Sequence, residues 1–147
     1  MSQILRMVFL VSIVALVPMA AGARATFHDL DIKQAMDSDV GKSKLLGVPV
    51  YFAGQSHAKV ASDMGVFTAN RRTNAVAKSD EKACGIAFLS AVIALQARVQ
   101  KMGGDAVVDI KSITKNRNLE SATQYRCAAG NIVANVALTG RVVKFVK

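Results

Sequence analysis

The sequence predicts an α+β fold in which one long helix packs on a mostly antiparallel sheet of about four strands. Two observations support this prediction. Residues 80–102 repeat their apolar side chains with helical spacing, and residues 105–114, 123–129 and 130–147 are short β-rich segments that follow it. A helix with one apolar stripe and strands with one apolar face can bury those surfaces against each other.

The first 25 residues have the pattern of a secretory signal peptide. Arg6 provides a positive start, Met7 to Val17 is an apolar run, and Pro18 ends it before the small-residue triplets that end at Ala23 and Ala25. The apolar run is too short for a stable membrane span. We therefore expect cleavage near Ala23 or Ala25, a periplasmic or secreted protein, no transmembrane segment after cleavage, and a single domain over residues 26–147.

The region between the signal peptide and the long helix has weaker patterns. Residues 29–47 predict a short polar helix that ends near Gly47. Residues 48–54 form a β-rich run closed by a glycine, and residues 66–70 predict a second short strand. Residues 71–83 are polar and predict a connection up to the start of the long helix.

The long helix has clear signals at both ends. Ser79 or Asp80 can cap its start, because a side-chain oxygen accepts from the free amides of the first turn. Asp80 and Glu81 suit the positive end of the helix dipole, and Gly103 is the residue type that ends a helix. One apolar stripe runs along it: Cys84, Phe88, Val92, Leu95, Val99 and Met102. This stripe predicts a core face.

The segments after the helix alternate with the period of strands. In residues 105–114 we expect one face to pack on the helix: Ala106, Val108, Ile110 and Ser112. A polar turn region follows, and residues 123–129 alternate again with one inward face: Thr123, Tyr125, Cys127 and Ala129. The last segment predicts a third strand in this part of the chain, with Gly130 and Gly140 as bulge or bend positions.

Two glycine motifs resemble nucleotide-binding loops but lack the required context. Gly41 begins a GKS triplet, yet a phosphate loop needs a glycine five residues earlier and a preceding strand, and this position is Met36. Gly103 and Gly104 end a helix, whereas a dinucleotide fingerprint precedes one. We therefore predict neither nucleotide binding nor any other cofactor.

The sequence also offers few ligands for a metal or for nucleophilic catalysis. His28 and His57 are not spaced with Cys84 and Cys127 as zinc ligands are. A Cys/His nucleophile would need His57 beside one of the cysteines. The acidic residues nearest to a calcium-loop pattern are too irregular for it: Asp31, Asp37 and Asp39. We expect no metal site, no catalytic residue and no enzymatic activity.

The two cysteines have two interpretations. In an oxidising compartment a pair of cysteines most often forms a disulfide, which predicts a Cys84–Cys127 bond. Alternatively, Cys84 is a reactive thiol, because amide dipoles in the first turns of a helix lower the pKa of a thiol, although burial acts against this. The second interpretation gives an alternative function, a thiol-dependent redox or metal-handling protein.

A disulfide requires that the two cysteines lie at the same level. Cys84 precedes Met102 by 18 residues, or about 27 Å of helix. If a hairpin turns tightly near residues 116–117, Cys127 pairs opposite Ala106 and falls roughly 20 Å short, whereas Cα atoms must come within about 7 Å.

A hairpin centred near residues 119–120 changes this outcome. Cys127 would then lie opposite Ser112, and a modest tilt of the helix would bring it to Cys84. The disulfide hypothesis therefore predicts a wide loop over residues 115–123. A Cys84–Cys127 bond would close a loop of about 43 residues, which would stabilise the fold by roughly 4 kcal/mol through the entropy of the unfolded chain.

The charge of the chain favours anionic partners. Residues 1–25 hold Arg6 and Arg24, so cleavage lowers the basic count from 19 to 17 against 10 acids and leaves a net charge of +7. The chain has no Trp, and its aromatic residues do not alternate with basic ones, so we expect no nucleic-acid partner. We expect an envelope protein or an anionic surface to bind at these residues: Arg71, Arg72, Lys115, Arg117 and Arg126. The alternative is that the charge serves solubility alone.

Several separated motifs support a family resemblance. They are, in order, YFAGQSHAKV, NRRTNA, ACGIAFLSAVIALQARVQKMGGDAVVDIKS, YRCAAG and VALTGRVVKF. With these motifs the chain resembles a family of small exported bacterial proteins of unknown function. Some members carry the label of an excinuclease ATPase subunit, which gives a nucleotide- or DNA-repair role as a remote alternative. No intact phosphate loop or zinc-finger cysteine set in this sequence supports that label.

The segment from the helix to YRCAAG is also distantly similar to two other groups. One is the outer-membrane lipoprotein that senses envelope stress for the Rcs phosphorelay, and the other consists of small domains described as heavy-metal-binding. The lipoprotein resemblance implies an α+β fold in which disulfides hold the strand of Cys127. This sequence has Ser112 where the lipoprotein has a cysteine, and we expect no lipid anchor, so the resemblance does not carry stress sensing over.

Overall fold

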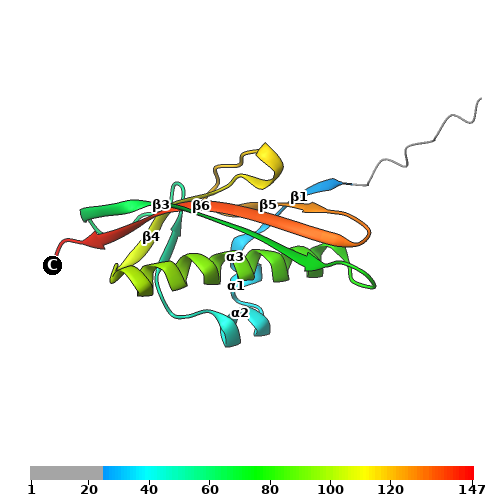
Figure 1. Ribbon diagram of the computed structural model, residues 1–147, viewed down its shortest axis with the longest axis horizontal. Coiled ribbons are helices and arrows are strands. Elements are labelled where there is room, and N and C mark those ends of the chain that lie inside the picture. Colours follow the sequence, from blue (N-terminus) through cyan, green and yellow to red (C-terminus); the bar gives the residue numbers. More distant parts are fainter. Residues whose placement is uncertain (1–24) are drawn as a thin grey trace, which may run out of the picture.

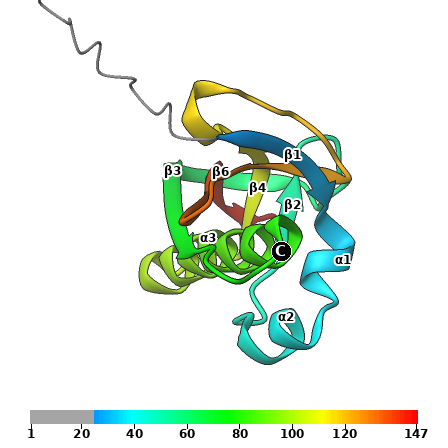
Figure 2. The same cartoon turned by 90° about the vertical axis from the view of Figure 1, so that its right-hand side faces the viewer.

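The computed structural model describes residues 25–147, so the predicted signal peptide lies outside the described residues except for Ala25. The elements in chain order are β1 (Thr26–Asp31), α1 (Ile32–Met36), α2 (Asp39–Lys44), β2 (Val50–Phe52), β3 (Val60–Asn74), α3 (Asp80–Met102), β4 (Ala106–Ser112), the 3-10 turn η1 (Thr114–Asn116), β5 (Gln124–Ala129) and β6 (Val133–Phe145). The predicted α+β class is confirmed. The helices lie on one side of the sheet, and the loop that contains η1 lies on the other (Figures 1 and 2).

The long helix α3 forms as its end signals predict. The side chain of Ser79 accepts from the backbone N–H of Lys82, and Gly103 ends the helix in the left-handed conformation at φ 70°. The apolar stripe is core, since Cys84, Phe88 and Val92 are fully buried. By length and composition alone α3 could cross a membrane, but 56% of its most apolar window is buried inside the fold, as in the core helix of a globular domain.

Within the described residues the sheet has six strands, two more than expected, and it is mixed. Strand β6 is its centre, since β3 pairs with one edge of β6 over its whole length while β4 and β5 lie end to end along the other edge. Strand β1 lies beyond β5, and β2 lies beyond β4 as the only parallel neighbour among the described strands. Every other pairing is antiparallel.

Three differences from the sequence prediction lie before α3. The predicted helix over residues 29–47 contains the end of β1 and two short helices, α1 and α2. The short strand at 66–70 is the middle of the much longer β3. The predicted connection at 71–83 begins inside that strand, because Arg71 to Asn74 pair with β6 up to Val133. The polar residues of this segment gave no indication of a strand. They are tolerated because β3 pairs only with β6 and no described strand lies along its other edge.

A β-bulge in β4 puts the part of the strand before it on the opposite face from the predicted one, whereas Ile110 after it faces the core as predicted. Asp109 has φ 53°, and the register with β6 shifts between Val108 and Lys111. The predicted inward residue Ile110 packs in the main core with α3, but before the bulge it is Val107 that packs there, and the predicted inward residues Ala106 and Val108 join a small separate cluster. One extra residue in a strand moves the following side chains to the other face.

Candidate functional site

Cys84 of α3 and Cys127 of β5 form a disulfide, as one of the two interpretations predicts. Their Cα atoms are 5.8 Å apart, and both side chains are fully buried. Neither thiol is therefore free in this structure, and the two residues tie the first turns of α3 to the sheet. A buried structural bond of this kind is typical of exported proteins.

The strand arrangement that allows the bond differs from the predicted hairpin. Strand β5 does not pair with β4 as its hairpin partner, and Cys127 lies opposite His28 of β1. Ser112 still lies next to this strand, because its hydroxyl accepts from the backbone N–H of Arg126 at 2.9 Å. The predicted wide loop is present, since residues 113–123 connect β4 to β5 along the same edge of β6, and Leu119 within it pairs back with Ser112.

The end-to-end arrangement explains how the two cysteines reach the same level. Leu138 of β6 pairs with Ser112, and Asn135 pairs with Ala128, so β5 continues the line of β4. Cys127 then lies about seven strand residues beyond Ala106 along β6, or about 23 Å. This is close to the roughly 27 Å that α3 rises from Met102 back to Cys84.

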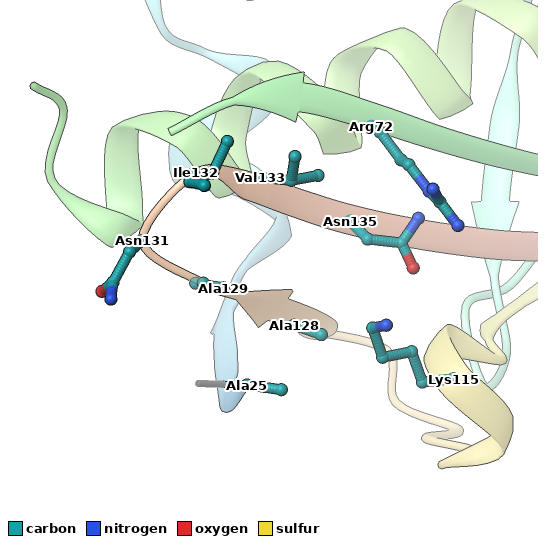
Figure 3. Close-up of a pocket in the computed structure, with 10 residues that line it drawn as sticks. Ala25, Arg72, Lys115, Ala128, Ala129, Asn131, Ile132, Val133 and Asn135 are labelled. Atoms are coloured by element: carbon teal, nitrogen blue, oxygen red, sulfur yellow. The ribbon is translucent and has the colours of Figure 1, made fainter. Parts of the chain in front are cut away.

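Two of the predicted basic residues meet at a cavity on the sheet face that α3 does not cover. Arg72 and Lys115 line a space of about 430 Å³ together with Asn135, and no acidic residue lines it. Figure 3 shows Asn135 between the two cations, above the small side chain of Ala128. Neither Arg72 nor Lys115 forms an ion pair or side-chain hydrogen bond with another residue of the described part of the chain.

The fold places these side chains through strand pairing and one anchored turn. Arg72 of β3 lies directly opposite Asn135 of β6, so both point to the same face. The amide nitrogen of Asn135 donates to Asn70 Oδ1 at 2.5 Å and to the Arg71 carbonyl at 3.0 Å. Its oxygen is left on the side of Lys115 (Figure 3).

Lys115 reaches the cavity because Thr114 anchors the loop that carries it. The fully buried Thr114 hydroxyl donates to the Arg126 carbonyl at 2.7 Å and accepts from the Ala137 N–H at 3.0 Å. These bonds lie on the edge of β6 at the position between the end of β4 and the start of β5. Lys115 and Asn116 then turn the chain with positive φ values of 48° and 59°.

The other predicted basic residues do not line this cavity. Arg126 forms a two-bond ion pair with Asp29, at 2.7 Å for each bond, and these bonds lower the pKa of Asp29 below its usual value. Arg117 stacks over the ring of Phe27, 4.7 Å from its centroid. Arg71 pairs with Val136, a residue of the core next to α3, and therefore lies on the opposite face from Arg72.

The histidines lie apart from each other. His28 Nε2 is 3.0 Å from Asp80 Oδ2, and His57 stacks on Phe145 with its ring bonded to the Ala58 carbonyl. The histidine opposite Cys127 is thus His28 and not His57. Within residues 25–147 no group of three or more His, Cys, Asp or Glu side chains could hold a metal ion.

Asn135 is a residue of this cavity that the sequence pattern did not single out. It is 5% exposed and is the only polar residue in the run IVANVAL, between two apolar stretches. A single amide side chain within an apolar strand could have indicated a residue with a specific role, because a buried amide needs a hydrogen-bond partner.

Comparison of the chain with protein-family models, with curated proteins and with solved structures found no match. The family resemblance of the sequence motifs therefore stays a prediction.

Proposed function

We propose that this protein is an exported, non-enzymatic envelope domain that binds an anionic group in the cavity between Arg72 and Lys115. The main support for the proposal is that two cationic side chains line one cavity. Neither cation has an ion-pair partner among the described residues, and no acidic residue lines the cavity. The buried Cys84–Cys127 bond is compatible with an oxidising, exported location.

A phosphate group fits the chemistry of this cavity best. The Arg72 guanidinium can donate two parallel hydrogen bonds to phosphate oxygens, and the Lys115 ammonium adds a second positive charge. Asn135 presents an oxygen on the same side, so a hydroxyl next to the phosphate would have an acceptor. A phosphoglycerol headgroup of an anionic lipid combines both features.

The contacts of the other basic residues support the choice of Arg72 and Lys115 as the anion-binding pair. Arg126 is already neutralised by Asp29, and Arg117 is held over Phe27. An incoming anion would have to compete with these contacts, whereas Arg72 and Lys115 would gain an ionic partner without losing one. The thiol-dependent alternative would require reduction of a fully buried disulfide.

Vesicle binding tests this proposal. The mature protein should sediment with vesicles of phosphatidylcholine and phosphatidylglycerol, and not with phosphatidylcholine alone. The double variant Arg72→Gln/Lys115→Gln should lose most of this binding. The matched control Lys42→Gln/Lys101→Gln removes the same charge from exposed positions on α2 and α3, and it should retain binding. Equal loss in both double variants would show that net charge alone attracts the protein and would overturn the proposal.

A further inference from the structure

Tyr125 is a deeply buried side chain whose polar atom has no partner in the described part of the chain. It is 2% exposed, and its ring stacks on Phe88 with 3.9 Å between centroids. Its hydroxyl makes no hydrogen bond to another described residue. Among the described residues the sealed side-chain atom without a partner is Arg141 Nε, so the Tyr125 oxygen opens onto the space at the end of its ring and can bond to a group there.

The Tyr125 side chain lines a second cavity, separate from that of Arg72. This cavity has a volume of about 370 Å³ and lies where β1 and α1 meet the first turn of α3. Two acidic residues, Asp31 and Glu81, line the cavity, together with one cationic residue, Lys82. Leu30 adds an apolar side chain to the lining. The lining therefore carries a net negative charge on a protein that is otherwise basic.

The charges of this cavity act on the phenol. Burial, Glu81 and Asp31 together raise the pKa of Tyr125, so the hydroxyl is protonated at neutral pH. One oxygen of Asp31 is used to cap α1, where it accepts from the Gln34 N–H at 2.7 Å. The other Asp31 oxygen, the Glu81 carboxylate and the Tyr125 oxygen can accept further hydrogen bonds.

We propose that this second cavity binds a primary alkylammonium group, with Tyr125, Glu81 and Asp31 as its acceptors. An ammonium has three N–H donors and a compact positive charge, which matches acceptors of net negative charge. The methylenes next to the nitrogen would contact Leu30. The occupant is either a free alkyl diamine or a lysine side chain, since both present the same group.

The disulfide holds the walls of this cavity together. Glu81 precedes Cys84 by one helical turn, and Tyr125 precedes Cys127 by two strand residues. The bond between the cysteines therefore fixes the distance between the carboxylate on α3 and the phenol on β5. Reduction of the disulfide should weaken binding of the amine.

The tyrosine content of the chain allows a direct test. The protein has two Tyr and no Trp, so the variant Tyr51→Phe leaves Tyr125 as its only tyrosine. Titration of this variant with n-pentylamine should give a saturable change in tyrosine fluorescence, and n-pentanol should give none. Parallel titrations with 1,5-diaminopentane and with acetyl-lysine methylamide distinguish the two sources of the amine.

Calorimetric titration of n-pentylamine into further variants tests the residues. Tyr125→Phe and Glu81→Gln should each weaken binding by about tenfold or more, because each removes an acceptor for a charged donor. Glu120→Gln, which changes an exposed carboxylate elsewhere, should bind as the parent does. Circular dichroism verifies that each variant is folded. Equal binding of n-pentylamine and n-pentanol, or unchanged affinity in both Tyr125→Phe and Glu81→Gln, would overturn the proposal.

Discussion

The hydroxyl of Thr114 accepts a hydrogen bond from the backbone N–H of Ala137 at 3.0 Å, at the point where β4 has ended and β5 has not yet begun. The same hydroxyl donates to the Arg126 carbonyl at 2.7 Å. One side chain thus closes the gap in the edge of β6 and sets the direction of the loop that carries Lys115.

Replacing Thr114 with Val should therefore destabilise the protein. Val has nearly the same shape but leaves the buried Ala137 N–H without a partner, which costs about 1–3 kcal/mol of the free energy of unfolding. Urea denaturation measures this change. Thr114→Ser keeps the hydroxyl and should cost clearly less than Thr114→Val. If the two variants were equally unstable, the methyl contacts of Thr114 and not its hydrogen bonds would hold the loop.

Removing the disulfide should lower stability without abolishing the fold. The double variant Cys84→Ala/Cys127→Ala loses a cross-link over 43 residues, which should lower the free energy of unfolding by about 2–4 kcal/mol. The wild-type protein should resist alkylation until it is both unfolded and reduced, and its mass should then rise by two hydrogens before alkylation. Rapid alkylation of the folded, unreduced protein would contradict this assignment.

The Asp29–Arg126 ion pair should contribute to stability in a pH-dependent way. The hydrogen bonds from Arg126 lower the pKa of Asp29 from its ordinary value of 3.8. The folded state therefore holds its proton more weakly than the unfolded state, and the contribution is present above that value and lost as the pH falls below it.

The variant Asp29→Asn measures this contribution. The difference in unfolding midpoint between wild type and Asp29→Asn should be constant from pH 7 to about pH 5 and should shrink toward pH 3. Lys33 and Asp37 form an exposed ion pair within the region of α1, and Asp37→Asn serves as a surface control with a small effect. A difference that grew as the pH fell would contradict the assigned direction.

Gly140 should not tolerate a side chain. A Cβ atom at this position would lie 2.6 Å from Val107 Cγ1 and 2.9 Å from Ile110 Cγ1, because the bulge in β4 brings both side chains over it. Gly140→Ala should cost about 1–3 kcal/mol. Gly85→Ala is the matched control, since nothing lies within 4 Å of its added Cβ inside α3, and it should stabilise the protein by about 0.5–1 kcal/mol. Thermal unfolding of both variants checks this contrast.

The helix was predictable because its signals are local. The cap at Ser79, the apolar stripe from Cys84 to Met102 and the ending at Gly103 all lie within one segment. Strand faces were predictable only where no bulge intervened: Tyr125 and Cys127 face the core as expected, but the bulge at Asp109 puts Ala106 and Val108 on the opposite face from the predicted one. A positive φ at an aspartate leaves no clear mark in the sequence.

The candidate site was predictable only in part, because it depends on which strands are neighbours. Arg71 and Arg72 are consecutive residues of one strand, and consecutive side chains point to opposite faces of a sheet, so the two residues could not share one basic face. The meeting of Arg72 with Lys115 depends on the position of β6 between β3 and the η1 loop, which no local pattern indicates. Arg126 forms an ion pair with Asp29 of β1, a strand that the sequence pattern did not predict.

Chemical-shift mapping with glycerol 3-phosphate would locate a bound anion on the protein and so decide whether Arg72 and Lys115 hold it. We expect the shifts to concentrate on the Asn135 side chain, on Lys115, and on the backbone of the turn from Gly130 to Val133, all of which line the cavity. These shifts should disappear in Arg72→Gln/Lys115→Gln. Shifts centred on Arg117 and Arg126, or spread evenly over every basic residue, would contradict the claim that Arg72 and Lys115 form the anion site.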